Sequence, residues 1–498
     1  MKHTNDSVKN TIHNLKCSIY DGFFAQIYVN LTGTIFLPAY ALLLGAQPIY
    51  IGILAALPFL GTLAQLPGSL LVEKLQNRKK LVIGFAVAAR GIWIILIIES
   101  ILAAADYGSF LLSLLIVITA GSQILGSCAG VGWLSWMAAL VPEEIRGRYF
   151  GLRNSVLGIV TITLTIIGGY FLDWYRYHFP ADPLTRSFEI LFITAIIAGM
   201  VSAYFLYRQG DLRRQRVASS RPKPPAATAD PLKLFFEPLR HETFRRFIRF
   251  ALLWAFAVNF SSPFFIIYML VDLKFSYTLI SLYTMLAAVA DFIGMGFWGH
   301  FSDRFGNRAI IIVTALVVAL QPALWIFSNN SVFSVYFLIP LLHMTGAFFF
   351  AAYNLCAVNL VFRMAPKEQN SAFFAFWSVA SANGAAAGVG AIIGGILSQQ
   401  AAVLLPYFPG IFDSGFKIVF FASFLLRGSA LFLIRGIREE SGLPVRKFVE
   451  VLRSMKAWTD TMGSHPIMQF FLPASDSNAS TPYWPLWRRV KTDLSKNT

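Results

Sequence analysis

The sequence predicts an all-α membrane protein with twelve transmembrane helices in two pseudo-symmetric bundles of six. Three observations lead to this fold class. The chain of 498 residues is 56% hydrophobic but only 13% charged, whereas soluble globular proteins average about 25% charged residues. Apolar runs long enough to cross roughly 30 Å of hydrocarbon recur along the whole chain. Short motifs of the first half also return in the second half at a nearly constant offset.

The apolar runs form two sets of six, separated by a polar segment. We expect a polar tail at residues 1–18 and no cleaved leader, because the apolar run that follows is longer than a signal-peptide core. The first bundle should cover 19–207, a linker 208–246, the second bundle 247–436 and a tail 437–498. The predicted spans are 19–44, 48–72, 81–104, 109–140, 151–172, 187–207, 247–271, 277–300, 309–328, 332–362, 371–398 and 415–436.

The composition of the linker and the tail predicts that both segments lie outside the membrane. Proline and basic residues in 208–246 oppose a packed core, so we expect a cytoplasmic linker with a short surface helix near Leu232–Phe236. In the tail, Val445–Trp458 has helical spacing of apolar side chains beside basic ones. It forms either a helix on the inner leaflet or part of a disordered tail.

The net charge of +16 is strongly one-sided. Of the 41 Lys and Arg residues, only four fall on the side opposite the N-terminus: Arg176, Arg186, Lys274 and Lys417. By the positive-inside rule, the N-terminus, the linker and the C-terminus are expected in the cytoplasm, and the protein in the inner or cytoplasmic membrane. This distribution accounts for the basic charge without a nucleic-acid partner.

A short charged hinge gives the clearest internal repeat. The stretch Gly299–Arg308 reads G-H-F-S-D-R-F-G-N-R between two apolar runs, and Gly306 permits its tight turn. A second copy, Glu73–Arg78, lies 230 residues earlier. Other matches, such as Asn30 with Asn259, occur in the same order at similar offsets. Six spans per repeat predict parallel repeats, with a site near the midplane at their interface.

With these features the chain resembles the major facilitator superfamily over about residues 19–436. The family pattern in this hinge is roughly G-x-x-x-D-R-x-G-R-[RK], which the second half matches well. The first half departs from the pattern, with Glu73 in place of Asp and Gln76 in place of Gly. The resemblance implies a transporter whose bundles rock, and a hinge that acts as a cytoplasmic latch. The implied gating residues are Glu73, Arg78, Gly299, Asp303, Arg304 and Arg308.

Two other family patterns are absent from the sequence. The fourth span has no charged residue between Phe110 and Val141, where many proton-coupled members carry an arginine. The fifth span has glycines but lacks the proline of drug antiporters. The sequence therefore lacks both the usual coupling arginine and the usual antiporter hinge.

The sequence contains no motif for enzymatic chemistry. It has no P-loop, no H-E-x-x-H motif and no Cys/His cluster. The three cysteines, Cys17, Cys128 and Cys356, have no disulfide or zinc spacing. We expect no enzyme activity, no cofactor and no metal, and a monomer in the lipid bilayer.

Asp291 is the strongest candidate for a functional charge. It lies deep in the predicted eighth span, with Thr284 seven residues earlier on the same helical face. Placing a charged side chain at the centre of a span costs roughly 2.5–3.5 kcal/mol of insertion free energy. Such a residue therefore has either a structural partner or a function. An apolar medium favours the protonated acid, which suits proton coupling. We predict Asp291, with His343, as proton-coupling residues; the alternatives are a structural ion pair for Asp291 and simple packing for His343.

Other charged groups also fall in or near the spans. Arg90 and Arg427 are expected to have structural roles, because arginine can snorkel or pair with a neighbouring carboxylate. Glu99 lies nearer the outer face. Asp21 begins the first span and Arg153 begins the fifth, so they form either a gating ion pair at the cytoplasmic end or two independently solvated charges.

Polar side chains on several spans are the candidates for a substrate cavity. In the family, the first, fourth, seventh and tenth spans surround the cavity. Such side chains either bind cargo or only hydrogen-bond one helix to another. The candidates are Gln26, Asn30, Thr34, Gln123, Trp133, Trp136, Asn259, Ser262, His343, Asn354 and Asn383.

The function predicted from these features is secondary active transport of a small molecule by alternating access, with proton coupling as the working hypothesis. One alternative is an efflux pump for drugs or metabolites with the same fold. The other is a non-transporting assembly factor or sensor whose activity resides in the basic tail.

Overall fold

The computed structural model describes the chain except for short gaps and both ends of the sequence. The described residues are 2–33, 35–75, 78–102, 108–142, 145–210, 235–366, 369–382, 384–407 and 412–434. Within them, twelve segments are long and apolar enough to cross a membrane. These candidate spans are Asn10–Leu43, Pro48–Ser69, Arg78–Ser100, Gly108–Ala138, Arg146–His178, Thr185–Arg208, Glu242–Val271, Tyr277–Ser302, Asn307–Trp325, Ser334–Met364, Ala372–Ala401 and Gly415–Leu433. The predicted fold class is therefore confirmed.

The described part of the chain is built from helices. The first half contains α1 (Lys2–Leu31), α2 (Phe36–Leu43), α3 (Pro48–Gly61), η1 (Thr62–Ala64), α4 (Gln65–Leu75), α5 (Arg78–Gly91), α6 (Trp93–Leu102), α7 (Gly108–Leu140), α8 (Arg146–His178) and α9 (Thr185–Arg208). The second half contains η5 (Glu237–Arg240), α11 (Glu242–Val271), α12 (Tyr277–Phe305), α13 (Asn307–Trp325), η6 (Ser334–Leu338), α14 (Ile339–Met364), α15 (Asn370–Trp377), η8 (Ser378–Ala382), α16 (Ala385–Leu404), η9 (Leu405–Tyr407) and α17 (Gly415–Leu433).

Local sequence explains where several helices begin and end. Ser276 caps α12 by accepting a hydrogen bond from the backbone N–H of Leu279, at 3.2 Å. Gly306 joins α12 to α13 with φ of +84°, a conformation that favours glycine, so the predicted tight turn is present. Residues 2–18, expected as a polar tail, instead continue the first helix, because α1 begins at Lys2. The expected surface helices at 232–236 and 445–458 fall wholly or mostly outside the described residues.

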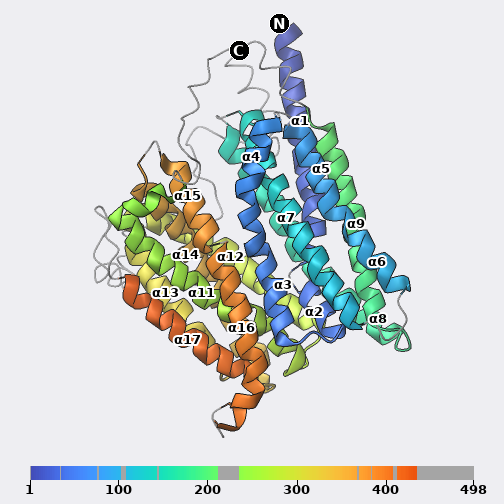
Figure 1. Cartoon of the computed structure of the whole chain (residues 1–498), viewed down its shortest axis with the longest axis vertical. Helices are drawn as coiled ribbons and strands as arrows, with labels where there is room; N and C mark the ends of the chain where they lie inside the picture. The colour runs from blue at the N-terminus through green and yellow to red at the C-terminus, as the bar shows by residue number, and fades with distance from the viewer. Residues whose placement is uncertain are drawn as a thin grey trace, which may run out of the picture.

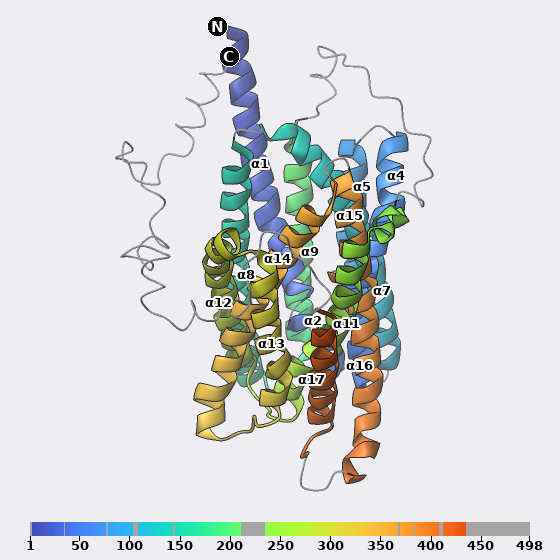
Figure 2. The same ribbon diagram turned by 90° about the vertical axis from the view of Figure 1, so that its left-hand side faces the viewer.

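The two halves form two groups of helices (Figure 1). Because twelve spans separate them, the start of α1 and the end of α17 lie on the same side. We call this side the basic face and the opposite side the far face. Figures 1 and 2 show the long axis of the bundles running from the N-terminal end of α1 towards the far face. In Figure 1, α4 and α15 stand apart near the basic face, whereas α3 and α16 run close together below them.

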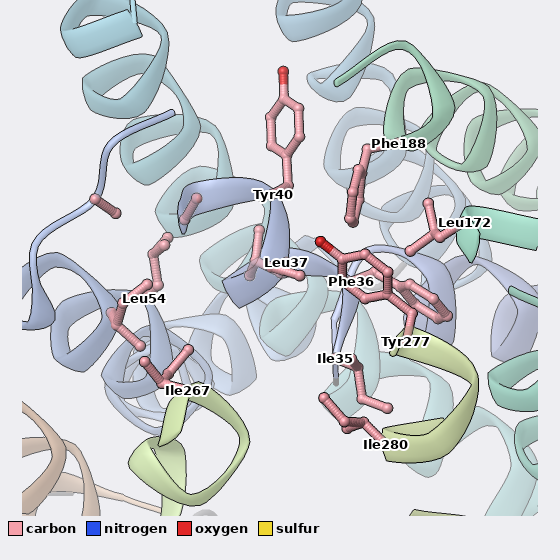
Figure 3. Close-up of a cluster of buried hydrophobic side chains, with 14 of the residues drawn as sticks. Ile35, Phe36, Leu37, Tyr40, Leu54, Leu172, Phe188, Ile267, Tyr277 and Ile280 are labelled. Atoms are coloured by element: carbon pink, nitrogen blue, oxygen red, sulfur yellow. The ribbon is translucent and has the colours of Figure 1, made fainter. Parts of the chain in front are cut away.

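Three clusters of buried apolar side chains show how the halves meet. The largest cluster, at the far face, draws on both halves and includes Ile35, Phe36, Ile267 and Tyr277 (Figure 3). The two clusters near the basic face each belong to a single half. One hydrophobic core therefore joins the halves at the far face, while separate cores hold each half at the basic face.

Candidate transport pathway

Small residues let the halves approach closely at the far face. A Cβ atom on Gly169 of α8 would lie 2.1 Å from the hydroxyl oxygen of Ser281 on α12. A Cβ atom on Gly52 of α3 would lie 2.5 Å from the carbonyl oxygen of Ala391 on α16. These helix pairs, α8 with α12 and α3 with α16, form the contact between the halves because glycine removes the side chain that would separate them.

Asp173 makes a second kind of contact across the halves. Its carboxylate on α8 accepts hydrogen bonds from the backbone N–H of Tyr277 at 3.1 Å and of Thr278 at 2.7 Å, and from the Thr278 hydroxyl at 2.6 Å. These groups are the exposed donors at the start of α12, where the helix dipole favours a negative charge. An acid of one half thus caps a helix of the other half. Gln399 adds a bond across the halves by donating to Gln47 Oε1 at 2.9 Å.

The same helix faces are uncovered nearer the basic face. On α12, Ser281 is fully buried against α8, but Met295 on the same stripe is 49% exposed. On α8, Gly169 is buried, whereas Gly158 is exposed and a Cβ atom there would meet nothing within 4 Å. The stripes that touch at the far face therefore do not cover each other at the basic face, so this conformation is closed at the far face and open at the basic face.

Asp291 lies on this uncovered stripe of α12. Steps of three and four residues connect Ser281, Thr284, Ala288 and Asp291, which places them along one side of the helix. Asp291 is about 15 Å from Ser281 along the helix axis towards the basic face. The side chain is half-buried and makes no hydrogen bond or ion pair with the described residues. An acid midway along a span is thus left without a partner.

Two asparagines from neighbouring helices share this property of lacking a partner on another helix. Asn259 of α11 donates only to the carbonyl oxygen of Ala255 in its own helix, at 2.9 Å, and is half-buried. Asn354 of α14 is half-buried and makes no hydrogen bond to the described residues. Ser262 bonds only within α11, to Val258. No other helix makes a hydrogen bond to these three residues, and among the described residues the same holds for Gln123, Trp133 and His343.

The polar stripe of the first span holds α1 to α8 instead. Gln26 donates to the Thr161 hydroxyl at 2.8 Å, and Asn30 donates to the Thr165 hydroxyl at 3.0 Å. Asn30 is almost completely buried. The structure shows that this stripe makes hydrogen bonds between helices, and its role in binding cargo stays a prediction. Thr34 and Asn383 lie outside the described residues.

The fourth-span candidates, all on α7, also have packing contacts. Trp136 lies in the core of the first half at the basic face. Gln123 packs against α3 at Gly61, whose Cβ atom would lie 3.0 Å from that of Gln123. Trp133 is half-buried, and the guanidinium carbon of Arg153 lies 4.3 Å from the centroid of its ring, within cation–π range.

His343 does not lie beside Asp291. Its ring stacks on Tyr283 of α12, with the centroids 5.6 Å apart, and it packs edge-on against Trp325 at 5.5 Å. Tyr283 and Asp291 are eight residues apart on α12, a rise of about 12 Å. The structure therefore places the two proton-coupling candidates at different depths, and a proton passing between them would need intermediates.

The charged residues of the first half gather around Asp21. Asp21 is buried and accepts a hydrogen bond from the Ser202 hydroxyl at 2.5 Å. Arg153 extends along α1, with Nε 3.5 Å from the Ser18 carbonyl oxygen. Arg90 donates to the Gly199 carbonyl oxygen at 2.8 Å. Asp21 and Arg153 are neighbours, as predicted, but among the described residues they form no direct ion pair.

Arg427 binds three helices of the second half from within the core. It is 3% exposed and donates to the carbonyl oxygens of Val318 on α13 at 2.8 Å and Val258 on α11 at 3.2 Å. It also donates to the hydroxyls of Ser423 and Ser261 at 3.1 Å and 3.0 Å. The predicted structural role of Arg427 agrees with these contacts.

The hinge after α12 is fixed by polar residues that the motif does not include. The Ser302 hydroxyl donates to Asn307 Oδ1 at 2.6 Å, and Asn359 of α14 donates to the Ser302 hydroxyl at 3.2 Å. Gly299 packs beside Leu355 of α14. The gating role of Glu73, Arg78, Asp303, Arg304 and Arg308 stays a prediction, and the side chains of Glu73 and Asp303 lie outside the described part.

Twelve apolar spans in two bundles that touch at one face define an integral multi-pass membrane protein. The family model described as Major Facilitator Superfamily matches residues 22–269 and 250–491. The chain belongs to the Major Facilitator Superfamily, and the resemblance seen in the sequence is confirmed. Its two matched segments also confirm the tandem repeat.

Solved structures of transporters share the fold at low sequence identity. The nucleoside transporter NupG aligns over 85% of this chain and 99% of its own, with 15% identity and a TM-score of 0.61. A D-xylose–proton symporter covers 87% and 99%, with 14% identity and a TM-score of 0.61. A bacterial homologue of the iron transporter ferroportin, in an inward-facing state, covers 86% and 99%, with 13% identity and a TM-score of 0.59. No curated protein matches the chain.

Proposed function

We propose that this protein is a secondary active transporter that moves a small polar molecule by alternating access. The observation that carries the proposal is the division of the hydrophobic core, which is shared between the halves at the far face and separate at the basic face. Two such bundles can exchange the open and closed faces by rocking. The one-sided distribution of Lys and Arg supports a cytoplasmic basic face and an inner-membrane location.

We further propose that transport is coupled to protons through Asp291. Three acids within the spans have partners: Asp21 accepts from Ser202, Glu189 from Ser100, and Asp173 from the start of α12. Glu99 has none among the described residues, but it lies at the far end of its span. Asp291 has none among the described residues and lies on the uncovered stripe. A carboxylate with this placement can take up and release a proton as its surroundings alternate between the two faces.

Asn259 and Asn354 are the proposed cargo contacts. Their amides offer donors and acceptors that no neighbouring helix uses. A cargo with hydroxyl or amide groups would form hydrogen bonds with these two side chains. A purely apolar cargo would leave their amides without partners, so a polar cargo is favoured.

Labelling of single cysteines in proteoliposomes tests the proposal. Gly158→Cys should react with a thiol reagent applied from the basic face, and Ile280→Cys, buried in the shared core, should react only after the far face opens. A cargo identified by thermal-shift screening should change the two rates in opposite directions. Rates that rise or fall together would contradict alternating access.

A further inference from the structure

We propose that a pocket at the far face binds a small organic ammonium ion and that its occupancy holds the far face closed. This inference rests on the proposed alternating access. The pocket has a volume of about 770 Å³ and lies where α11, α16 and α17 end or begin at the far face, beside Asn329 and Asn330. Pro48 at the start of α3 completes its lining, so both halves contribute to it.

The pocket carries one carboxylate that no cation neutralises. Lys417 lies 2.8 Å and 2.9 Å from the two oxygens of Asp413, so these charges compensate each other. Asp272, directly after α11, has no such partner among the described residues. Asp272 is exposed at one side, but partial burial still raises its pKa, and the charge of Asp413 acts in the same direction. A hydrogen bond from Ser414 and, more weakly, the charge of Lys417 lower the pKa in opposition. The pocket therefore favours a positive ligand beside Asp272.

The aromatic rings and the hydroxyl group that line the pocket indicate which other groups the ligand carries. Phe416 lines the pocket, and aromatic faces attract alkylammonium groups. Tyr268 also lines it, but Lys417 Nζ already lies 5.9 Å from the centroid of the Tyr268 ring. Ser398 also lines it, is 7% exposed, and its hydroxyl has no hydrogen-bond partner among the described residues. A buried hydroxyl without a partner is unfavourable, so a ligand that bonds to it would gain affinity. The three features together fit a small ammonium ion that also carries a hydroxyl group.

The position of the pocket links binding to conformation. Pro48 belongs to the first half and every other residue named here belongs to the second. Gly395, just before Ser398 on α16, approaches Pro48 closely, since a Cβ atom on Gly395 would lie 2.9 Å from the Pro48 carbonyl oxygen. When α3 and α16 separate, Pro48 leaves the pocket. A ligand that contacts both sides therefore stabilises the closed far face.

Binding is tested with choline, which has both an ammonium and a hydroxyl group, and with tetramethylammonium, which lacks the hydroxyl. Calorimetry on the purified full-length protein should show saturable choline binding that weakens at least tenfold in Asp272→Asn. Ser398→Ala should weaken choline binding and leave tetramethylammonium binding unchanged. Asp182→Asn changes an acid of the first half that pairs with Arg186, so it serves as the matched control and should bind like the wild type.

The pH dependence gives a further check on the site. Because the pKa of Asp272 is raised, choline affinity should begin to fall at a higher pH than for an ordinary aspartate as the solution is acidified. Asp413 and Lys417 are the other charged groups at the pocket, and Asp413→Asn should reduce this effect. Equal choline binding by the wild type and Asp272→Asn, or no saturable binding, would overturn the inference.

The conformational part uses Ile280→Cys in a protein whose three native cysteines are replaced. Choline should slow labelling of this cysteine from the far face severalfold, and Asp272→Asn should abolish the slowing. If labelling occurs but choline does not slow it, this inference fails and alternating access stands. If the cysteine never reacts under any condition, the proposed function fails as well.

Discussion

Asp291 and Arg427 are both charged residues inside spans, and their surroundings differ completely. Arg427 reaches four acceptors on three helices, which satisfies a cation that the membrane would otherwise exclude. Asp291 has no partner among the described residues. The sequence predicts both residues as intramembrane charges, but it cannot distinguish them, because three of the four acceptors of Arg427 lie about 110 to 170 residues away along the chain.

Replacing Asp291 should uncouple cargo transport from the proton gradient. We expect Asp291→Asn to reduce cargo accumulation driven by a pH gradient at least tenfold, because the amide cannot carry a proton, while exchange of cargo without a gradient continues. Transport assays in proteoliposomes measure both quantities. Glu99→Gln, a change to an acid near the far end of another span, is the control. Unaltered accumulation by Asp291→Asn would remove this residue from the coupling step.

Replacing Arg427 should destabilise the second half. Arg427→Lys keeps the charge but cannot reach carbonyl groups on both α11 and α13, so buried acceptors lose their donors. We expect a loss of about 2 to 4 kcal/mol of folding free energy, seen as a lower melting temperature in detergent. Arg186→Lys, at an exposed ion pair, should melt like the wild type. Equal melting of the two variants would show that the network contributes little.

At the scale of helices, the spans were predictable but their contacts were not. Hydropathy places most spans within a few residues, because membrane thickness sets their length. The first span is the main exception, since it begins at Asn10 and not at residue 19. The contacts between the halves at the far face cannot be predicted from hydropathy. Asp173 looks like an ordinary acid near a span end, and nothing local shows that it caps α12 of the other half. Gly169 is one of several glycines in its span, and nothing in the local sequence shows that it lies against Ser281 of the other half.

Removal of the Asp173 cap should favour opening at the far face. Asp173→Ala leaves the first N–H groups of α12 without their acceptor, so the closed contact loses stability. We expect labelling of Ile280→Cys from the far face to become at least threefold faster. Asp182→Ala, which removes an acid from the same end of the first half without touching α12, should leave the rate unchanged. A rate unaffected by Asp173→Ala would contradict a role in closure.

For the whole molecule, the tandem repeat and the two bundles could be predicted from the sequence, whereas the conformation could not. Hydropathy and repeated motifs define six spans per half, and the family match confirms them. Which face is closed depends on which side chains of the two halves meet, such as Ile35 with Ile280 in the shared core. That pairing involves residues far apart in sequence, and a rocking protein can exchange it for another.

Deleting the tail distinguishes two hypotheses, namely that the protein is a transporter or that it is a sensor with the same fold. The twelve candidate spans and the buried clusters of the described residues all lie before residue 435. We therefore expect a protein lacking residues 440–498 to keep at least half of the transport rate per inserted molecule. The assay compares both proteins in vesicles at equal protein content. Loss of all activity with a normal melting temperature would favour the sensor.

The two buried arginines also carry a record of ancestry. Arg90 on α5 donates to Gly199 on α9, and Arg427 on α17 donates to Val318 on α13. Residues 90 and 318 are 228 positions apart, and so are 199 and 427. The two descendants of one ancestral unit thus kept the same helix-to-helix bridge but placed the cation at opposite ends of it. The same position between these two helices thus accommodates a guanidinium from either direction.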